Sequence, residues 1–361
     1  MRKFLTLAAL VCIPELAMAN YLNDAGNAWG TIAPGGPTKT GTVATRLRDL
    51  GGGSASTYSE IIETIAFNNS ALIILETLSH IHDVVEFESD INKTDKMPIV
   101  ISGKMTNRHS TYNSDVNSEF RTLQNGIVLT AGSFVSDKFQ VGLGFSDTRS
   151  KNNQTLMDNV GKSYSVSGFA KYAVPEFFVN LSLGIGATGW TDDKLAFGVA
   201  SIANYDSNFY YADASIGTVF MPTKDFQIIP RIGLNHISIT TDRHTDSLNQ
   251  SFAKWNYSQT AGVAGLEFAN NFHVDDFIIR PAVSASGNFI LNQRHGDAVH
   301  ATLINGNFYD IPVDAPADVG YSIGGGIGFI GTKFSANISY AYGSRGEYES
   351  HAATLHFTAA F

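Results

Sequence analysis

From about Pro98 to the end of the chain, apolar side chains recur at every second position, and this alternation limits the possible folds more than any other feature. The stretches "FQVGLGF" at 139–145 and "FSANISYAYG" at 334–343 show it cleanly. A third stretch, "FFVNLSLGIGA" at 177–187, sets an apolar face against a face that is mostly Asn, Ser and Gly. A period of two indicates β-strands with one apolar face and one small or polar face.

The connections between these strands alternate in length. Long polar stretches fall at 108–119, 148–162, 190–208, 241–254 and 293–316, tight turns lie near residues 135, 174, 221, 269 and 331, and a short connection spans 343–349. Long loops at one end and tight turns at the other are typical of an outer-membrane β-barrel. The loops of a soluble β-sandwich, the alternative, need not alternate in this way. Charged residues make up 16% of the chain, below the roughly 25% usual in soluble proteins.

We therefore predict an all-β transmembrane barrel of about twelve antiparallel strands over residues 98–361. A sheet in hydrocarbon cannot leave an edge unpaired, so the first strand, at about 98–108, should pair with the last. Aromatic residues near the strand ends suit the two interfacial girdles, and the candidates are Tyr172, Phe220, Phe272, Tyr321 and Tyr342.

Residues 1–19 have the features of a secretory signal peptide. Two basic residues precede a mostly apolar run at 4–13, and Ala17-Met18-Ala19 forms an A-x-A site that predicts cleavage between Ala19 and Asn20. The single cysteine, Cys12, lies inside this leader, so the mature chain has no disulfide framework. The formal net charge of −9 makes nucleic acid an unexpected partner.

Two segments separate the leader from the barrel. Residues 20–57 are rich in Gly, Thr and Pro, which predicts a short exported segment or linker that cannot bury a core of its own. Residues 58–90 are predicted to form an α-helix, because Thr57 and Glu60 have capping-box spacing and apolar residues recur at helical spacing. This helix either fills the lumen just before the first strand or lies outside it, as a periplasmic or dimer-forming helix.

Arg231 and Arg280 fall on the strand face opposite the apolar residues, so both should point into the lumen. Glu267 is their expected partner, in a lumenal charge network or, alternatively, in a ligand or transport site. The histidines show no metal-ligand spacing, and no glycine-rich phosphate loop follows a parallel strand. No metal and no cofactor are expected.

The order of signal peptide, exported segment, helix, twelve strands and terminal aromatic residue resembles the autotransporter (type V secretion) β-domain. The resemblance covers about 98–361 and the helix before it, and it rests on the strand patterns "GIVLTAGSF", "FQVGLGFSDT" and "FFVNLSLGIGATGW", on "YSIGGGIGFIGTKFSANISYAYG" and on the end "HAATLHFTAAF". It implies a monomeric outer-membrane barrel, a helix threaded through its lumen, and an N-terminal segment anchored at or translocated to the cell surface. Residues 20–57 are far fewer than the long passengers of that family, so a passive pore or a loop-based adhesin is the alternative.

The same resemblance suggests partners and candidate residues. Such barrels are inserted into the lipid by the barrel assembly machinery with periplasmic chaperones, and this machinery would recognise the last strand through Leu355, Phe357 and Phe361. Some relatives release their passenger by cyclisation at adjacent asparagines, for which Asn68 and Asn69 are the candidates here, given a nearby carboxylate.

An enzyme is the less favoured alternative. His236 and Ser238 stand two apart on one strand face and resemble the His-x-Ser of the outer-membrane phospholipase A family, another twelve-stranded barrel. That resemblance implies that His236 would activate Ser238 and that Asn249, across the following loop, would be the third member. The residues around this pair do not match that family, so we expect a protein that is not an enzyme.

Overall fold

The computed structural model describes residues 99–361 of the chain, apart from 113–119, 154–156, 175–176, 197–198, 296–297, 303–307 and 313–316. The regular elements of this part are all β-strands. Within it, no helix is long and apolar enough to cross a membrane. The predicted signal peptide, linker and helix, together with Asn68 and Asn69, lie outside the described residues.

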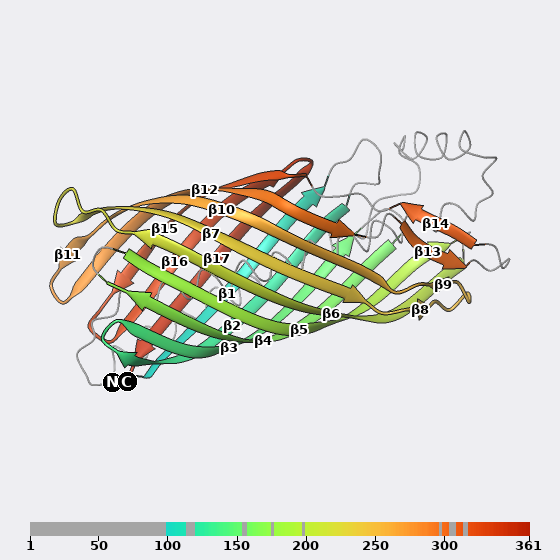
Figure 1. Ribbon diagram of the computed structural model, residues 1–361, viewed down its shortest axis with the longest axis horizontal. Helices are drawn as coiled ribbons and strands as arrows, with labels where there is room; N and C mark the ends of the chain where they lie inside the picture. Colours follow the sequence, from blue (N-terminus) through green and yellow to red (C-terminus); the bar gives the residue numbers. More distant parts are fainter. Residues whose placement is uncertain are drawn as a thin grey trace. The chain divides into compact units, whose positions relative to one another are not determined.

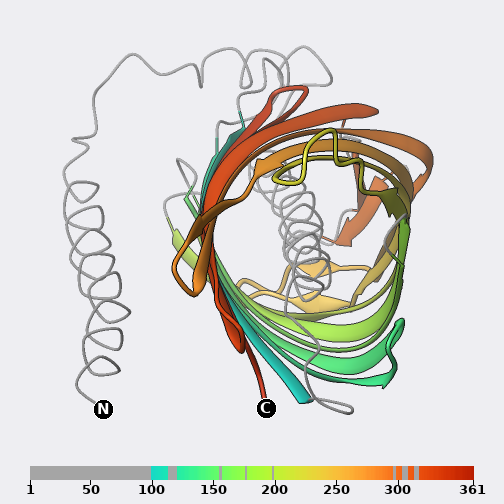
Figure 2. The same cartoon turned by 90° about the vertical axis from the view of Figure 1, so that its left-hand side faces the viewer.

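Twelve long antiparallel strands form a closed barrel (Figures 1 and 2). They are β1 (Ile99–Tyr112), β2 (Phe120–Ser136), β3 (Phe139–Asn153), β4 (Met157–Ala173), β5 (Phe177–Ala196), β6 (Val199–Thr218), β7 (Phe226–Thr241), β10 (Trp255–Asn270), β12 (Phe277–His295), β15 (Val319–Ile330), β16 (Phe334–Arg345) and β17 (Tyr348–Ala360). Each strand pairs with the next along the chain, and β17 pairs back with β1. The predicted fold class is confirmed.

The seam between β1 and β17 closes the barrel. The two strands pair in register from Val100 opposite Ala360 to Tyr112 opposite Tyr348. At its end, the Phe361 N–H donates to the Ile99 carbonyl over 2.9 Å. The predicted pairing of first and last strands is confirmed, and it leaves no unpaired backbone edge facing hydrocarbon.

The two faces of the barrel wall differ in chemistry. On β5, Leu183 and Ile185 are exposed on the outer face, whereas Asn180 and Ser182 are buried on the inner face. The same alternation runs round the wall, so the outer face is a continuous apolar band. Such an outward apolar band is typical of barrels that span a membrane.

The two ends of the barrel also differ. At the turn end, which also holds the start of β1 and the end of β17, strands are joined by short turns such as residues 137–138 and 331–333. At the loop end lie the connections 113–119, 242–254 and 296–318. The aromatic residues expected in the girdles follow this division: Tyr172, Phe220 and Phe272 lie near the turn end, and Tyr321 and Tyr342 lie toward the loop end.

The prediction of two of the long loops is wrong, because the structure shows mostly strand there. Strands β3 and β4 stay paired as far as Asn153 opposite Asp158, and β5 and β6 stay paired as far as Ala196 opposite Val199. Residues 148–162 and 190–208 are therefore mostly strand. Polar residues are frequent on the outer face there because the hairpins extend beyond the lipid. The backbone hydrogen bonds of the strands continue whatever the polarity of the side chains.

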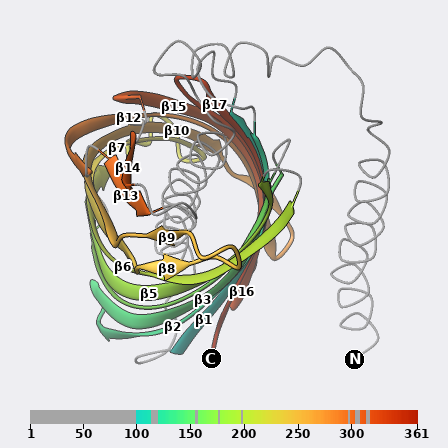
Figure 3. The same ribbon diagram turned by 90° about the vertical axis from the view of Figure 1, so that its right-hand side faces the viewer.

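A second, four-stranded sheet lies at the loop end. It comprises β8 (His244–Thr245), β9 (Ser251–Phe252), β13 (Ala298–Thr302) and β14 (Phe308–Pro312). Figure 3 shows these strands within the outline of the barrel mouth. The Ser247 N–H donates to the Ile202 carbonyl over 2.9 Å, and the Ser201 hydroxyl donates to Asp246 over 2.9 Å, so the sheet is attached to β6.

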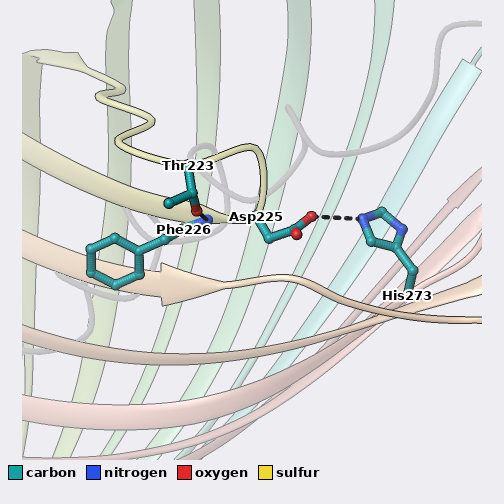
Figure 4. Close-up of polar contacts among 4 residues, drawn as sticks. All are labelled: Thr223, Asp225, Phe226 and His273. Atoms are coloured by element: carbon teal, nitrogen blue, oxygen red, sulfur yellow. Dashed lines mark hydrogen bonds and ion pairs between the residues drawn. The ribbon is translucent and has the colours of Figure 1, made fainter.

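At the turn end, two hairpins are joined to each other. The imidazole Nε2 of His273, on β11 (Phe272–Val274), lies 3.2 Å from the Asp225 carboxylate of the turn before β7 (Figure 4). The Asn271 N–H also donates to the Asp225 carbonyl over 2.8 Å. The Thr223 hydroxyl accepts from the Phe226 N–H and shapes the turn that presents Asp225.

Candidate functional site

The lumen is the candidate functional site, because its inner wall concentrates the buried polar groups. Pairs of hydroxyls lie within hydrogen-bond distance across neighbouring strands, such as Ser146 with Ser165 at 2.6 Å and Ser207 with Thr241 at 2.8 Å. These contacts join β3 to β4 and β6 to β7. They satisfy hydroxyls that could not face lipid without losing their hydrogen bonds.

The inner wall is positively charged, although the chain as a whole is acidic. Among the described side chains of the twelve barrel strands, six basic residues point inward: Lys104, Arg108, Lys171, Arg231, Arg280 and Arg345. Three acidic residues share that face: Asp192, Asp213 and Glu267. The excess of positive charge favours an acidic occupant of the lumen.

The strongest imbalance lies in the half of the lumen near the turn end. A cavity of about 330 Å³ there is lined by four of the basic residues and by Glu267. The Arg280 Nη2 donates to Glu267 Oε1 over 3.2 Å, with the Arg280 side chain only 8% exposed. Arg231 lies opposite Gly265 on the neighbouring strand, and a Cβ added at Gly265 would lie 2.8 Å from the Arg231 Nε. The structure thus places Arg231, Glu267 and Arg280 together at the inner wall.

The other half of the lumen, toward the loop end, has an aromatic inner wall. A buried cluster there comprises Val128, Trp190, Ala203, Tyr205, Phe209, Tyr211, Ile237, Ile239, Phe252, Trp255, Tyr257 and Ala301. The connection 242–254 contributes to it, because the His244 ring stacks on Tyr205 at 4.2 Å between ring centres. The half of the lumen near the turn end therefore has the larger excess of positive charge, and the half toward the loop end has the buried aromatic rings.

Several inward rings lie against glycines of neighbouring strands. A Cβ at Gly142 would lie 2.3 Å from the Phe169 ring, and one at Gly184 would lie 2.3 Å from the Tyr211 ring. A Cβ at Gly161 would lie 2.4 Å from the Trp190 ring. The missing side chains let the rings lie flat against the wall, which keeps their bulk out of the centre of the lumen.

The sequence model of the autotransporter β-domain family matches residues 103–343. The chain belongs to the autotransporter β-domain family. Autotransporter β-domains are outer-membrane proteins, so this barrel lies in the outer membrane. In such barrels the short turns face the periplasm and the long loops face outside. The turn end is therefore periplasmic and the loop end extracellular.

Solved autotransporter barrels share the fold at low sequence identity. The translocator domain of NalP from Neisseria meningitidis aligns with a TM-score of 0.65 and 11% identity, over 81% of this chain and 98% of that chain. The transport unit of AIDA-I from Escherichia coli aligns with a TM-score of 0.58 and 15% identity, over 81% and 99%. The β-domain of Bordetella BrkA aligns with a TM-score of 0.58 and 14% identity, over 73% and 100%. No curated protein matches the sequence.

The last strand of this autotransporter barrel presents its alternate residues to the lipid. Phe357 and Phe361 are exposed on the outer face, and Leu355 shares their parity. His356 and Thr358 are buried on the inner face. The aromatic side chain of Phe361 thus lies at the periplasmic rim, beside Ile99.

The three residues of the lipase hypothesis do not form a triad here. His236 and Ser238 lie within β7 on the outer face, but the His236 Nδ1 lies 2.8 Å from the Thr260 hydroxyl. Asn249 lies in the turn between β8 and β9, where its backbone has a φ of 61°. In the described part of the chain no hydrogen bond joins any two of the three. The described residues also hold no group of three or more His, Cys, Asp or Glu that could bind a metal.

Residue-by-residue reasoning missed the aromatic half of the lumen and the contacts between glycines and rings. The inward rings of β6 are scattered through "NYDSNFYYAD" at 204–213, where polar residues alternate with them and resemble a loop. Gly142 and Phe169 are 27 positions apart in the chain, and only the register of β3 with β4 brings them together. Aligning the registers of neighbouring strands would have shown the inward rings and their contacts with glycines.

Proposed function

We propose that this barrel anchors the chain that precedes β1 in the outer membrane and lets that chain pass through the lumen to the cell surface. In this proposal the signal peptide, residues 1–19, is cleaved after export, and residues 58–88 occupy the lumen. The charge of the inner wall is the observation that carries it. The similar barrel of NalP is a translocator domain and that of AIDA-I is a transport unit, which agrees with such a role.

The charges of wall and segment are complementary. Residues 58–88 contain six acidic residues and no Lys or Arg, whereas the described inner wall has twice as many basic as acidic side chains. In a confined space of low dielectric, such complementarity is worth more than it would be in water. The apolar stripe of the same segment, Ile61, Ile65, Leu72, Leu75 and Leu78, has a matching surface in the aromatic half of the lumen.

The route follows from the position of β1. This strand begins at the periplasmic end, beside Phe361. The chain before Ile99 must therefore either stay in the periplasm or cross the membrane through the barrel, because the wall has no open edge.

Surface labelling tests this proposal directly. An epitope inserted after Asn27 is expected to bind antibody on intact cells, and to be removed by external protease while the barrel stays intact. An epitope in the periplasmic turn at Asp137 and Lys138 is the matched control, and it should be labelled only after the outer membrane is permeabilised. If both epitopes required permeabilisation, the N-terminal residues would not reach the surface, and a pore or loop-based adhesin would be favoured.

We also propose that the barrel assembly machinery recognises the last strand through Leu355, Phe357 and Phe361. This proposal is supported by the exposure of Phe357 and Phe361 on the outer face and by the position of Phe361 at the periplasmic rim. Phe361→Asp is expected to lower the amount of folded barrel in the outer membrane several-fold, with unfolded chain accumulating in the periplasm. This is measured by the heat-dependent gel shift of membrane fractions.

A variant at a second aromatic residue distinguishes lost recognition of the last strand from the loss of an aromatic residue at the membrane interface. Phe220 is also exposed and lies at the same end of the barrel, but outside the last strand. Phe220→Asp should reduce assembly much less than Phe361→Asp. Equal losses in the two variants would mean that a charge at the interface, and not lost recognition, causes the defect.

A further inference from the structure

A groove runs over the outer face of the barrel, where strands β3 to β7 leave the apolar band. Its volume is about 560 Å³. Phe145, Val166 and Ile185 line its apolar part. It exists because small residues alternate with large ones across the strands: Ala187 lies opposite Tyr164, and Ser238 lies opposite Tyr210.

The groove ends at the height where the wall becomes polar. On the outer face of β3, Phe145 is the last apolar residue before Asp147, Arg149 and Lys151. On β4, the next outward residue beyond Tyr164 is Lys162. The groove therefore lies beside the hydrocarbon of the outer leaflet, and the basic residues lie at the level of the lipid headgroups.

Two cations face each other directly above the groove. Arg149 and Lys162 are opposite each other in the register of β3 and β4, and both are exposed. Among the described residues, neither forms an ion pair. Like charges placed directly opposite on one sheet face destabilise the pairing of the strands. A bound anion that contacts both would remove that repulsion.

The other charged residues on this outer face do not neutralise the positive charge of Arg149 and Lys162. Lys151 is paired with Asp158, with Nζ 3.7 Å from Oδ2. Asp147 lies one outward position below Arg149, and Asp206 lies two strands from Lys162 across Gly189. Neither carboxylate is within ion-pair distance of the two cations. Asp147 shares β3 with Arg149, and Asp158 shares β4 with Lys162, but Asp158 is already paired with Lys151. The carboxylates on these two strands therefore offset only part of the charge of the two cations.

We propose that this face binds a phosphorylated lipid of the outer leaflet. Its phosphate lies between the Arg149 guanidinium, which can donate two parallel hydrogen bonds to it, and the Lys162 ammonium. One of its acyl chains lies in the groove below, between Tyr164 and Tyr210. Both parts of the site belong to the same outer face, so a single amphipathic molecule in the membrane orientation contacts both.

The test uses the full chain, purified in detergent, with diphosphorylated lipid A as the probe and native mass spectrometry as the readout. The wild-type barrel is expected to retain one lipid. The double variant Arg149→Gln with Lys162→Gln should bind about tenfold more weakly, since each basic residue near a lipid surface contributes measurably. Lys254→Gln, which removes an exposed cation from the loop before β10, is the matched control and should bind as wild type.

The two halves of the site are tested separately. Lipid A from which both phosphates have been removed should bind the wild type as weakly as the double variant binds the intact lipid. Ala187→Leu, which fills the groove, should weaken binding of both lipids; Ser238→Leu is the second variant if the first fails to fold in a gel-shift assay. The proposal is overturned if the double variant retains the lipid, if removal of phosphate has no effect, or if both groove-filling variants bind as wild type.

Discussion

Replacing Gly142 with valine is expected to cost about 3 kcal/mol or more of barrel stability, through overpacking of a wall that cannot yield. A Cβ at this position would lie 2.3 Å from the Phe169 ring and 2.5 Å from the Ala131 carbonyl oxygen. The ring could swing toward the lumen, but the carbonyl belongs to the backbone of β2 and cannot move without breaking the sheet. The measurement is the urea midpoint of the folded barrel in detergent, with the heat-dependent gel shift as a second readout.

Gly168 supplies the control, because it lies next to Phe169 on the outer face of β4. A Cβ there would meet nothing within 4 Å, so Gly168→Val adds the same atoms toward lipid and should leave the midpoint nearly unchanged. Adding Phe169→Ala to Gly142→Val should restore only part of the loss, because the contact with the Ala131 oxygen remains. Equal midpoints for the two valine variants would show that the wall at Gly142 is not tightly packed.

Deleting residues 58–88 is expected to raise the single-channel conductance of the purified barrel several-fold. In our proposal this segment fills the lumen, and its removal opens a path between the two lumenal halves. The exposed wall should then favour anions, because six basic residues outnumber three acidic ones among its described inward side chains. The reversal potential in a salt gradient measures that preference, which follows the sign of the charge lining a pore.

Two further variants test whether the charge of the wall and the sequence of residues 58–88 cause the change in conductance and selectivity. Arg231→Gln in the deleted chain should reduce the anion preference, because Arg231 lines the charged cavity. Replacing residues 58–88 by a Gly/Ser stretch of equal length, which has neither the acidic residues nor the apolar stripe, should also leave the pore open. If the deletion changed neither conductance nor selectivity, residues 58–88 would not occupy the lumen.

The alternation of side chains was enough to predict the strands, their number and their two faces, because lipid imposes a strict rule on every outward position. It was not enough to predict where the strands end. Residues 148–162 and 190–208 look like loops only because lipid no longer selects their outward side chains. Inside the barrel, Asn159 accepts from Asn152 and donates to Asp192, which links β3, β4 and β5 in this region.

The lumen was partly predictable. The inward direction of Arg231, Glu267 and Arg280 follows from parity, and the contact between Glu267 and Arg280 requires only that β10 and β12 be neighbours. The part of the aromatic half that lies on barrel strands follows from strand register, but the part added by the connection 242–254 could not be predicted, because it depends on that connection folding back so that His244 and Phe252 join the wall. A loop of polar composition gives no signal of that return.

The seam between β1 and β17 sets the order in which the molecule can form. Ser102 and Thr358, whose hydroxyls lie 3.0 Å apart across it, are 256 positions apart in the chain. Hairpins such as β1 with β2 can pair as soon as both strands are exported, but the other edge of β1, which pairs with β17, must wait for the entire remainder of the barrel. Its open edge is a template for wrong partners throughout that interval, and contacts between such distant residues form slowly. A barrel in which β17 has not yet paired with β1 therefore exposes a strand edge that the closed barrel does not have.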